Sequence, residues 1–160
     1  MTLPSQIAGI SLDFIIVAAL FAVIFFFVWR RGIADGGAAL MSIYIAGFLY
    51  QNVPVDRLVL FSGSAGMATF SKMIIFGVIF AVVWWLVART LLLSLGGGGR
   101  SLFVSGGLAL AIVLLLLAYS YHLIALEPLY NFGPLFDRFL APEQHFLWLL
   151  LAPLAVLLFV

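Results

Sequence analysis

The chain contains no cysteine and few charged residues. Without cysteine it has no disulfide framework, no thiolate nucleophile and no cysteine-based metal site. Only 8% of the 160 residues are charged, seven of them basic and six acidic, and the formal net charge is +1. Nucleic-acid binding requires clustered basic side chains on one face, so we expect no nucleic-acid partner.

Apolar residues dominate what remains. Hydrophobic residues make up 66% of the chain, and the charged ones lie between long apolar runs rather than within them. This composition supplies too little polar surface to cover a water-soluble protein of this size, so a lipid bilayer is the expected surrounding. The runs are continuous rather than alternating, which predicts helices. The expected fold class is therefore an all-α integral membrane protein, with residues 1–160 in a single membrane domain.

Four of the apolar runs are long enough to form spans, since about 20 helical residues cross a hydrocarbon core of ~30 Å. The predicted spans are 12–29, 36–51, 73–95 and 101–124, and they form a four-helix transmembrane bundle. After them, apolar residues recur at helical spacing in 129–141, which predicts an interfacial amphipathic segment. The apolar tail 145–160 is short for a span and contains Pro153. It is either a fifth span or a membrane-embedded tail.

Polar residues and glycines predict the connections between these runs. Arg30, Arg31, Gly32 and Asp35 are expected to form a tight turn, and the cluster 63–66 is expected to lie in a loop after the second span. The four glycines at 96–99 superficially suggest a phosphate-binding loop, but they lack the required spacing and lysine. A flexible hairpin is the expected structure there.

The basic residues predict the orientation of the chain in the membrane. One side of the membrane receives Arg30, Arg31, Arg89 and Arg100, and the other receives Arg57, Lys72 and Arg138. The first span has no basic residue before it and two directly after it, and the first helix usually dominates topology. We therefore expect the N-terminus outside and the two short basic connections in the cytoplasm.

Small residues recur along one face of the second and fourth spans, where they allow another helix to approach closely. These predicted packing residues are Ala39, Ser42, Ala46, Gly107, Ala111 and Ala118. We expect them to mediate helix packing.

Asp13 is the acidic residue closest to the first span. An intramembrane carboxylate is a candidate proton or ion site. In the first turn of a helix, however, a carboxylate can also cap free N–H groups, with Ser11 as the competing cap, and this interpretation is favoured. His122, Glu143 and His145 lack metal-ligand spacing, so no metal site, cofactor or catalytic residue is assigned.

The order of elements resembles that of the colicin V production protein family, small bacterial inner-membrane proteins. The resemblance lies in an acid that opens the first span, an Arg-Gly pair that closes it, and the small residues that follow. The matching residues are Asp13, Arg31, Gly32, Ser42, the segment 96–100, Gly106 and Gly107. It implies an inner-membrane protein that supports toxin production or secretion and envelope homeostasis, with no established catalytic residue.

Two functional hypotheses follow. The first is a non-enzymatic membrane component that acts through helix packing with itself or with partner membrane proteins. The second is a small transporter or channel subunit, which needs polar groups that converge at mid-membrane. The candidates for that role are Asp13, Ser42, Tyr44 and Tyr119. A third class, an intramembrane enzyme, lacks a recognisable pair of nucleophile and base.

Overall fold

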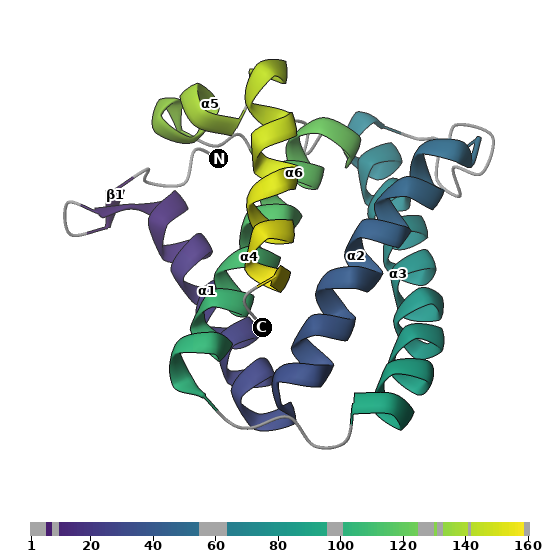
Figure 1. Ribbon diagram of the computed structural model, residues 1–160. Coiled ribbons are helices and arrows are strands. Elements are labelled where there is room, and N and C mark those ends of the chain that lie inside the picture. Colours follow the sequence, from purple (N-terminus) through teal and green to yellow (C-terminus); the bar gives the residue numbers. More distant parts are fainter. Residues whose placement is uncertain are drawn as a thin grey trace.

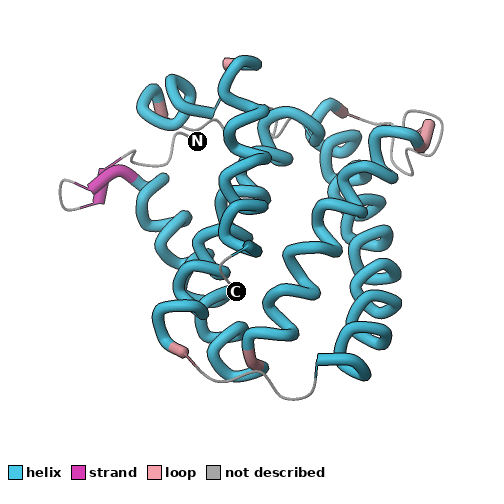
Figure 2. The backbone as a smooth tube through the Cα atoms, in the orientation of Figure 1, coloured by secondary structure: helices cyan, strands magenta, loops and turns pink. Residues whose placement is uncertain are grey.

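The protein is a bundle of helices (Figures 1 and 2), known here from a computed structural model. The structure describes residues 6–7, 10–54, 64–95, 101–124, 130, 133–140 and 142–158. A minimal antiparallel hairpin of β1 (Gln6–Ile7) and β2 (Ile10–Ser11) precedes the helices. The helices are α1 (Leu12–Arg31), α2 (Ile33–Asn52), α3 (Ala65–Leu95), α4 (Leu102–Tyr119) with a π-helical turn at Ser120–Ile124, α5 (Pro134–Leu140) and α6 (Glu143–Leu158).

Four of these helices are long and apolar enough to cross a membrane. They cover Leu12–Arg31, Ile33–Asn52, Gly66–Thr90 and Leu102–Ile124. The predicted all-α bundle with four spans is thus confirmed. α6 is shorter: its 16 residues rise about 24 Å, less than the ~30 Å of a hydrocarbon core. It packs along α4 as one apolar helix with Pro153 inside it.

The connection between α1 and α2 is shorter than predicted. Only Gly32 is non-helical, whereas the sequence predicted a polar turn from Arg30 to Asp35. Gly32 adopts φ 106°, which is open to glycine because it has no Cβ. Both arginines lie in the last turn of α1 and Asp35 in the first turn of α2, as the helix dipoles favour.

α3 begins earlier than the predicted span. The cluster 63–66 was expected to lie in a loop, but Ala65 and Gly66 are already helical. Ser64 explains the difference, because its side-chain oxygen accepts a hydrogen bond from the backbone N–H of Met67 at 3.3 Å. That contact is typical of a helix N-cap. The helix therefore begins before Lys72, the charged residue that precedes the apolar run of the predicted span.

The predicted interfacial segment is helical over a shorter range. α5 begins at Pro134, where a fixed φ and a missing N–H suit the first helical position. Phe136 and Leu140 face the bundle, while Phe139 is 67% exposed. The apolar stripe is therefore divided between two faces. The predicted members Leu129 and Phe132 lie outside the described residues.

Burial is distributed unequally among the four spans. In α2 and α4, 56% of the span is buried within the protein, against 11% in α1 and 17% in α3. α3 packs mainly along α2, and α1 packs mainly along α4. Figure 1 shows α2 between α1 and α3. α2 and α4 therefore form the centre of the bundle, and α1 and α3 form its flanks.

Close helix approaches depend on two glycines of α2. A Cβ on Gly36 would lie 2.8 Å from a methyl group of Val28 in α1 and 3.2 Å from one of Leu108 in α4. A Cβ on Gly47 would overlap the ring of Tyr119 in α4. Because interiors are close-packed, neither site has room for a larger residue without movement.

The predicted packing residues lie inside the chain. Five of the six are buried: Ala39, Ser42, Ala46, Ala111 and Ala118. Gly107 is partly exposed, and a Cβ placed on it would lie 3.8 Å from Val156 of α6. These small residues thus serve contacts between helices of the same chain.

The connections occupy two ends of the bundle. The α1–α2 turn and the end of α3 lie at one end, and the N-terminal hairpin and α5 lie at the other (Figure 1). Arg30, Arg31 and Arg89 belong to the first end, which we call the basic end, and Arg138 belongs to the opposite end. Arg57 and Arg100 lie outside the described residues.

The contact between Gly47 and Tyr119 gives a test of the packing. Gly47→Ala should destabilise the bundle by about 1–3 kcal/mol, because the added methyl group meets the Tyr119 ring. Gly77→Ala is the matched control, since a Cβ at this position in α3 meets nothing within 4 Å. The free energy of unfolding would be measured by titration with a denaturing detergent. Equal stabilities for the two variants would contradict the close approach.

Candidate functional site

Asp13 connects the start of α1 to the segment before α5. Its side chain is only 8% exposed. Oδ1 accepts a hydrogen bond from the hydroxyl of Tyr130 at 2.6 Å, and Oδ2 accepts one from the backbone N–H of Gly133 at 2.9 Å. Hydrogen bonds to a carboxylate are stronger than those between neutral groups. Asp13 therefore fixes two points of a segment that lies far away in the sequence.

One further contact completes this α1–α5 junction, which comprises Asp13, Phe14, Tyr130, Gly133 and Phe136. The rings of Phe14 and Phe136 lie 5.4 Å apart between centroids, in a tilted arrangement. A Cβ on Gly133 would lie 2.7 Å from Oδ2 of Asp13, so glycine is required for the close approach of this backbone to the carboxylate.

The π-helical turn at the end of α4 holds α5 from its other side. The hydroxyl of Tyr121 donates a hydrogen bond to Oδ1 of Asp137 at 3.0 Å. Nε2 of His122 lies 2.8 Å from the carbonyl oxygen of Leu140, and the His122 ring stands 4.4 Å from that of Phe146. A carbonyl only accepts, so Nε2 of His122 carries the proton in this contact. Short π-helical segments are frequent at functional sites.

This arrangement assigns Asp13 a role that the sequence did not suggest. Its hydrogen bonds go to Tyr130 and Gly133, which lie outside its own helix and far from it in the sequence. Its position in the first turn of α1 is still one that the helix dipole favours. A role for Asp13 as a proton or ion site stays a prediction.

Arg31 and Gly32, the other residues singled out by the sequence, lie at the opposite end of α1 from Asp13. Gly32 ends the helix, and its N–H donates to the carbonyl oxygen of Val28 at 2.8 Å. The guanidinium of Arg31 lies 5.8 Å from the ring centroid of Phe27, within the range of a cation–π contact. The three residues therefore do not form one site.

The other arginines of the basic end have similar neighbours. Arg30 lies 5.9 Å from the ring centroid of Phe26, and Arg89 lies 5.8 Å from that of Trp85. Both guanidinium groups belong to exposed side chains. Arginine next to an aromatic ring is typical of the headgroup boundary of a membrane.

Polar side chains within the spans mostly bond to their own helices. The hydroxyls of Ser42, Ser71 and Ser120 donate to the carbonyl oxygens of Ala38, Met67 and Leu117, at 2.6, 3.1 and 2.7 Å. The hydroxyl of Tyr44 instead crosses from α2 to α6 and donates to the carbonyl oxygen of Leu150. This contact lies next to the carbonyl of Leu149, which loses its helical donor because Pro153 has no N–H.

Two buried polar atoms have no hydrogen-bond partner in the part of the chain that the structure describes. They are Nε1 of Trp84 in α3 and Oγ of Ser105 in α4. A buried indole N–H usually finds an acceptor, so the unpartnered Trp84 requires an explanation.

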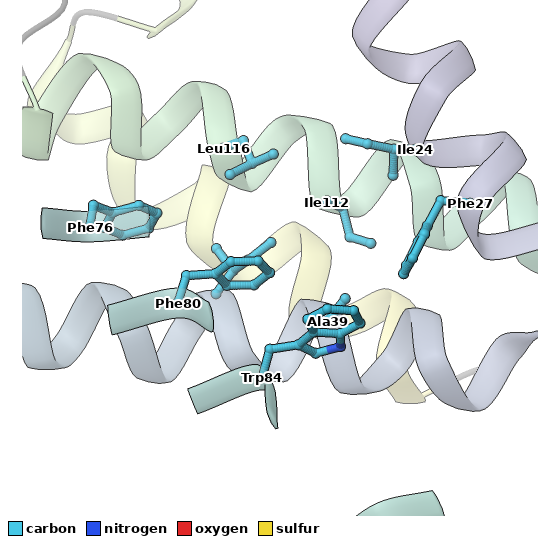
Figure 3. A pocket seen from close by; sticks show the side chains of 9 residues that line it. Ile24, Phe27, Ala39, Phe76, Phe80, Trp84, Ile112 and Leu116 are labelled. Atoms are coloured by element: carbon cyan, nitrogen blue, oxygen red, sulfur yellow. The ribbon is translucent and has the colours of Figure 1, made fainter. Parts of the chain in front are cut away.

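Trp84 lines an apolar cavity of about 280 Å³ among α1, α2, α3 and α4. Figure 3 shows Phe80 and Trp84 of α3 on one side, with side chains of α1 and α4 opposite them. A second cavity of about 300 Å³ lies farther along α1, α3 and α4 and shares Phe76 and Leu116 with the first. We call the two together the α1–α3 groove.

The sequence did not anticipate the residues that bind Asp13. Tyr130 and Gly133 lie more than a hundred residues away from it in the sequence. Clusters of three or more potential metal ligands do not occur among the described residues. Comparisons with family models, with curated proteins and with solved structures found no match for this chain.

The junction predicts that removing the Asp13 carboxylate loosens α5. Asp13→Ala leaves the Gly133 N–H and the Tyr130 hydroxyl without this acceptor, a loss of about 1–3 kcal/mol. Backbone hydrogen exchange of Pro134–Leu140 should become faster. The control is Asp35→Ala, which removes a first-turn acid at the opposite end of the bundle. Unchanged exchange in α5 of Asp13→Ala would count against the junction.

Tyr130 should report the same contact through its titration. The hydrogen bond to Asp13, together with burial, raises the pKa of Tyr130 from 10.0 to about 12. The neutral phenol is the donor, so the stability from this bond is fully present below pH 10 and is lost as the pH rises through about 12.

The titration is measured as the ultraviolet absorbance difference between the wild-type protein and Tyr130→Phe. In Asp13→Asn the pKa of Tyr130 should fall back toward 10.0, because the negative acceptor is gone. An identical Tyr130 titration in wild type and Asp13→Asn would show that the carboxylate does not hold the phenol.

Proposed function

We propose that this protein is a non-enzymatic component of the bacterial inner membrane that supports toxin production or export and envelope homeostasis. In this proposal it acts by packing against partner membrane proteins or a second copy of itself. The N-terminus lies outside, and the basic end faces the cytoplasm, in accord with the basic residues that follow the first span. The resemblance of the sequence to the colicin V production family supports the biological setting.

The observation that carries the proposal is the unequal burial of the spans. Large apolar side chains of α1 and α3 point outward, among them Val23 at 67%, Val78 at 58% and Trp85 at 61% exposure. The small-residue faces on α2 and α4 are already engaged inside the chain. Association with other proteins would therefore use the flanking helices, through van der Waals packing of these side chains in lipid.

The polar candidates for a transport path are engaged in structural contacts, which favours the packing role over a transporter. Ser42 bonds to its own helix, Tyr44 bonds to α6, and Tyr119 packs against Phe76 with ring centroids 6.1 Å apart. Asp13 lies in the first turn of α1, bound to Tyr130 and Gly133. Transport would need such groups to converge on a shared path near the middle of the membrane.

Site-specific crosslinking tests the proposed contact surface. The natural chain has no cysteine, so one introduced thiol is unique. Val82→Cys, on an outward position of α3, should form crosslinked adducts with other proteins in native membranes. Leu115→Cys, fully buried in α4, is the control and should form none. Equal, background-level crosslinking at both positions would contradict the proposed surface.

A secretion assay tests the biological setting separately. A bacterium that exports a colicin-type toxin should release less of it when this chain is removed, and the intact chain should restore release. Ion or solute flux through the purified protein in vesicles, abolished by Asp13→Asn, would instead favour the transporter hypothesis.

A further inference from the structure

The α1–α3 groove forms because the two flanking helices pack mainly against different central helices. α3 packs along α2, and α1 packs along α4. This leaves a hollow over α4 and α2, between the two flanking helices. The cavity lined by Trp84 exposes only apolar surface, and the adjoining one exposes almost only apolar surface. Each is close to ~300 Å³, the lower end of the range for ligand sites. Both are partly open, so an occupant can enter from the side.

The groove has the direction and length of a lipid chain. Along α3 it extends from Met73 to Trp84, which is about 16 Å at 1.5 Å per residue. One leaflet of a ~30 Å hydrocarbon core is about 15 Å thick. The groove follows spanning helices, so an acyl chain of the surrounding bilayer fits it without leaving its own leaflet.

The basic end of the groove places a cation beyond an apolar wall, which is the order in which a phospholipid presents its phosphate and acyl chain. Phe27 lines the cavity next to Trp84, with ring centroids 5.9 Å apart, and the Arg31 guanidinium lies 5.8 Å from the Phe27 ring. Arg31 stands one helical turn, about 5.4 Å, beyond Phe27. A phosphate at Arg31 would therefore place the ester carbonyls at the depth of Trp84. The ring of Trp84 would contact that part of the lipid, whereas its Nε1 is buried within the protein and does not face the cavity.

We propose that the α1–α3 groove binds one acyl chain of an anionic phospholipid, with the phosphate at Arg31 and the ester groups at the depth of the Trp84 ring. The proposal goes beyond the function proposed above and does not depend on it. A lipid of this kind fills a hollow that the protein leaves unpacked, and each close-packed methylene group contributes to binding. The exposed cations Arg30 and Arg89 add to the attraction for negative headgroups.

Tryptophan fluorescence offers a matched pair of reporters. Trp84 lines the groove, whereas its neighbour Trp85 is 61% exposed on the outside of α3. Two full-length variants each keep one of these residues and carry Phe in place of the other three tryptophans. Each is reconstituted in vesicles of phosphatidylcholine and phosphatidylglycerol, with bromine atoms on the acyl chains of one lipid at a time.

Brominated phosphatidylglycerol should quench Trp84 more strongly than brominated phosphatidylcholine at equal mole fraction. The expected preference is about fivefold, the effect of one basic side chain at a membrane surface. Trp85, which lies outside the groove beside the exposed Arg89, should show a weaker preference that Arg31→Gln leaves unchanged. Arg31→Gln should lower the preference at Trp84 to the level found at Trp85, while Arg138→Gln, which alters an exposed arginine of α5 at the other end, should leave it unchanged.

Three results would overturn the proposal. Equal quenching of Trp84 by the two lipids would mean that the headgroup is not recognised. Absence of quenching by either would mean that the groove is closed to acyl chains. Quenching that appears only when the protein is diluted in lipid would mean that a second copy of the chain occupies the groove.

Discussion

The need to satisfy backbone hydrogen bonds without water is the constraint on which the rest of this structure depends. In hydrocarbon each unpaired N–H or C=O costs several kcal/mol, so each span must be a helix. The interruptions follow the same constraint. Gly32 joins two helices through a single residue and still donates its N–H to Val28. The Tyr44 hydroxyl bonds to a carbonyl of α6 next to the one that Pro153 leaves without its helical donor.

Once the helices exist, the positions of the glycines determine how they pack. Gly36 and Gly47 allow α2 to approach α1 and α4 more closely than any side chain would permit. α2 and α4 are consequently the buried pair, and α1 and α3 can pack only on their outer sides. α1 and α3 pack mainly on different helices of the central pair and not on each other. The space between α1 and α3 is therefore less closely packed than the centre of the bundle. The α1–α3 groove is the physical result.

The sequence predicted the four spans and the fold class because both depend on local composition and length. Gly32 was identified as a turn residue, although the helices reach closer to it than the charges of Arg30 and Asp35 suggested. The α1–α5 junction could not be predicted, since nothing near Asp13 in the sequence indicates that Tyr130 and Gly133 will meet it. Likewise Phe136 and Asp137 had the right amphipathic pattern, but their partners Phe14 and Tyr121 come from distant helices. Local sequence patterns predict helices, whereas contacts between residues far apart in the sequence are set by the tertiary structure.

The two ends of the bundle differ in how their polar groups are used, and this difference separates a structural end from an interacting one. At the α5 end, Asp13 and Asp137 accept hydrogen bonds from tyrosines, and His122 bonds to a backbone carbonyl. At the basic end, the recorded neighbours of the arginines are aromatic rings of their own helices, which leaves their charge available to anions. Groups that already have internal partners hold a structure in place, whereas exposed cations above an apolar groove have the chemistry to bind an anionic lipid. The bilayer is thus at once the solvent of this protein and, at its basic end, the source of a ligand.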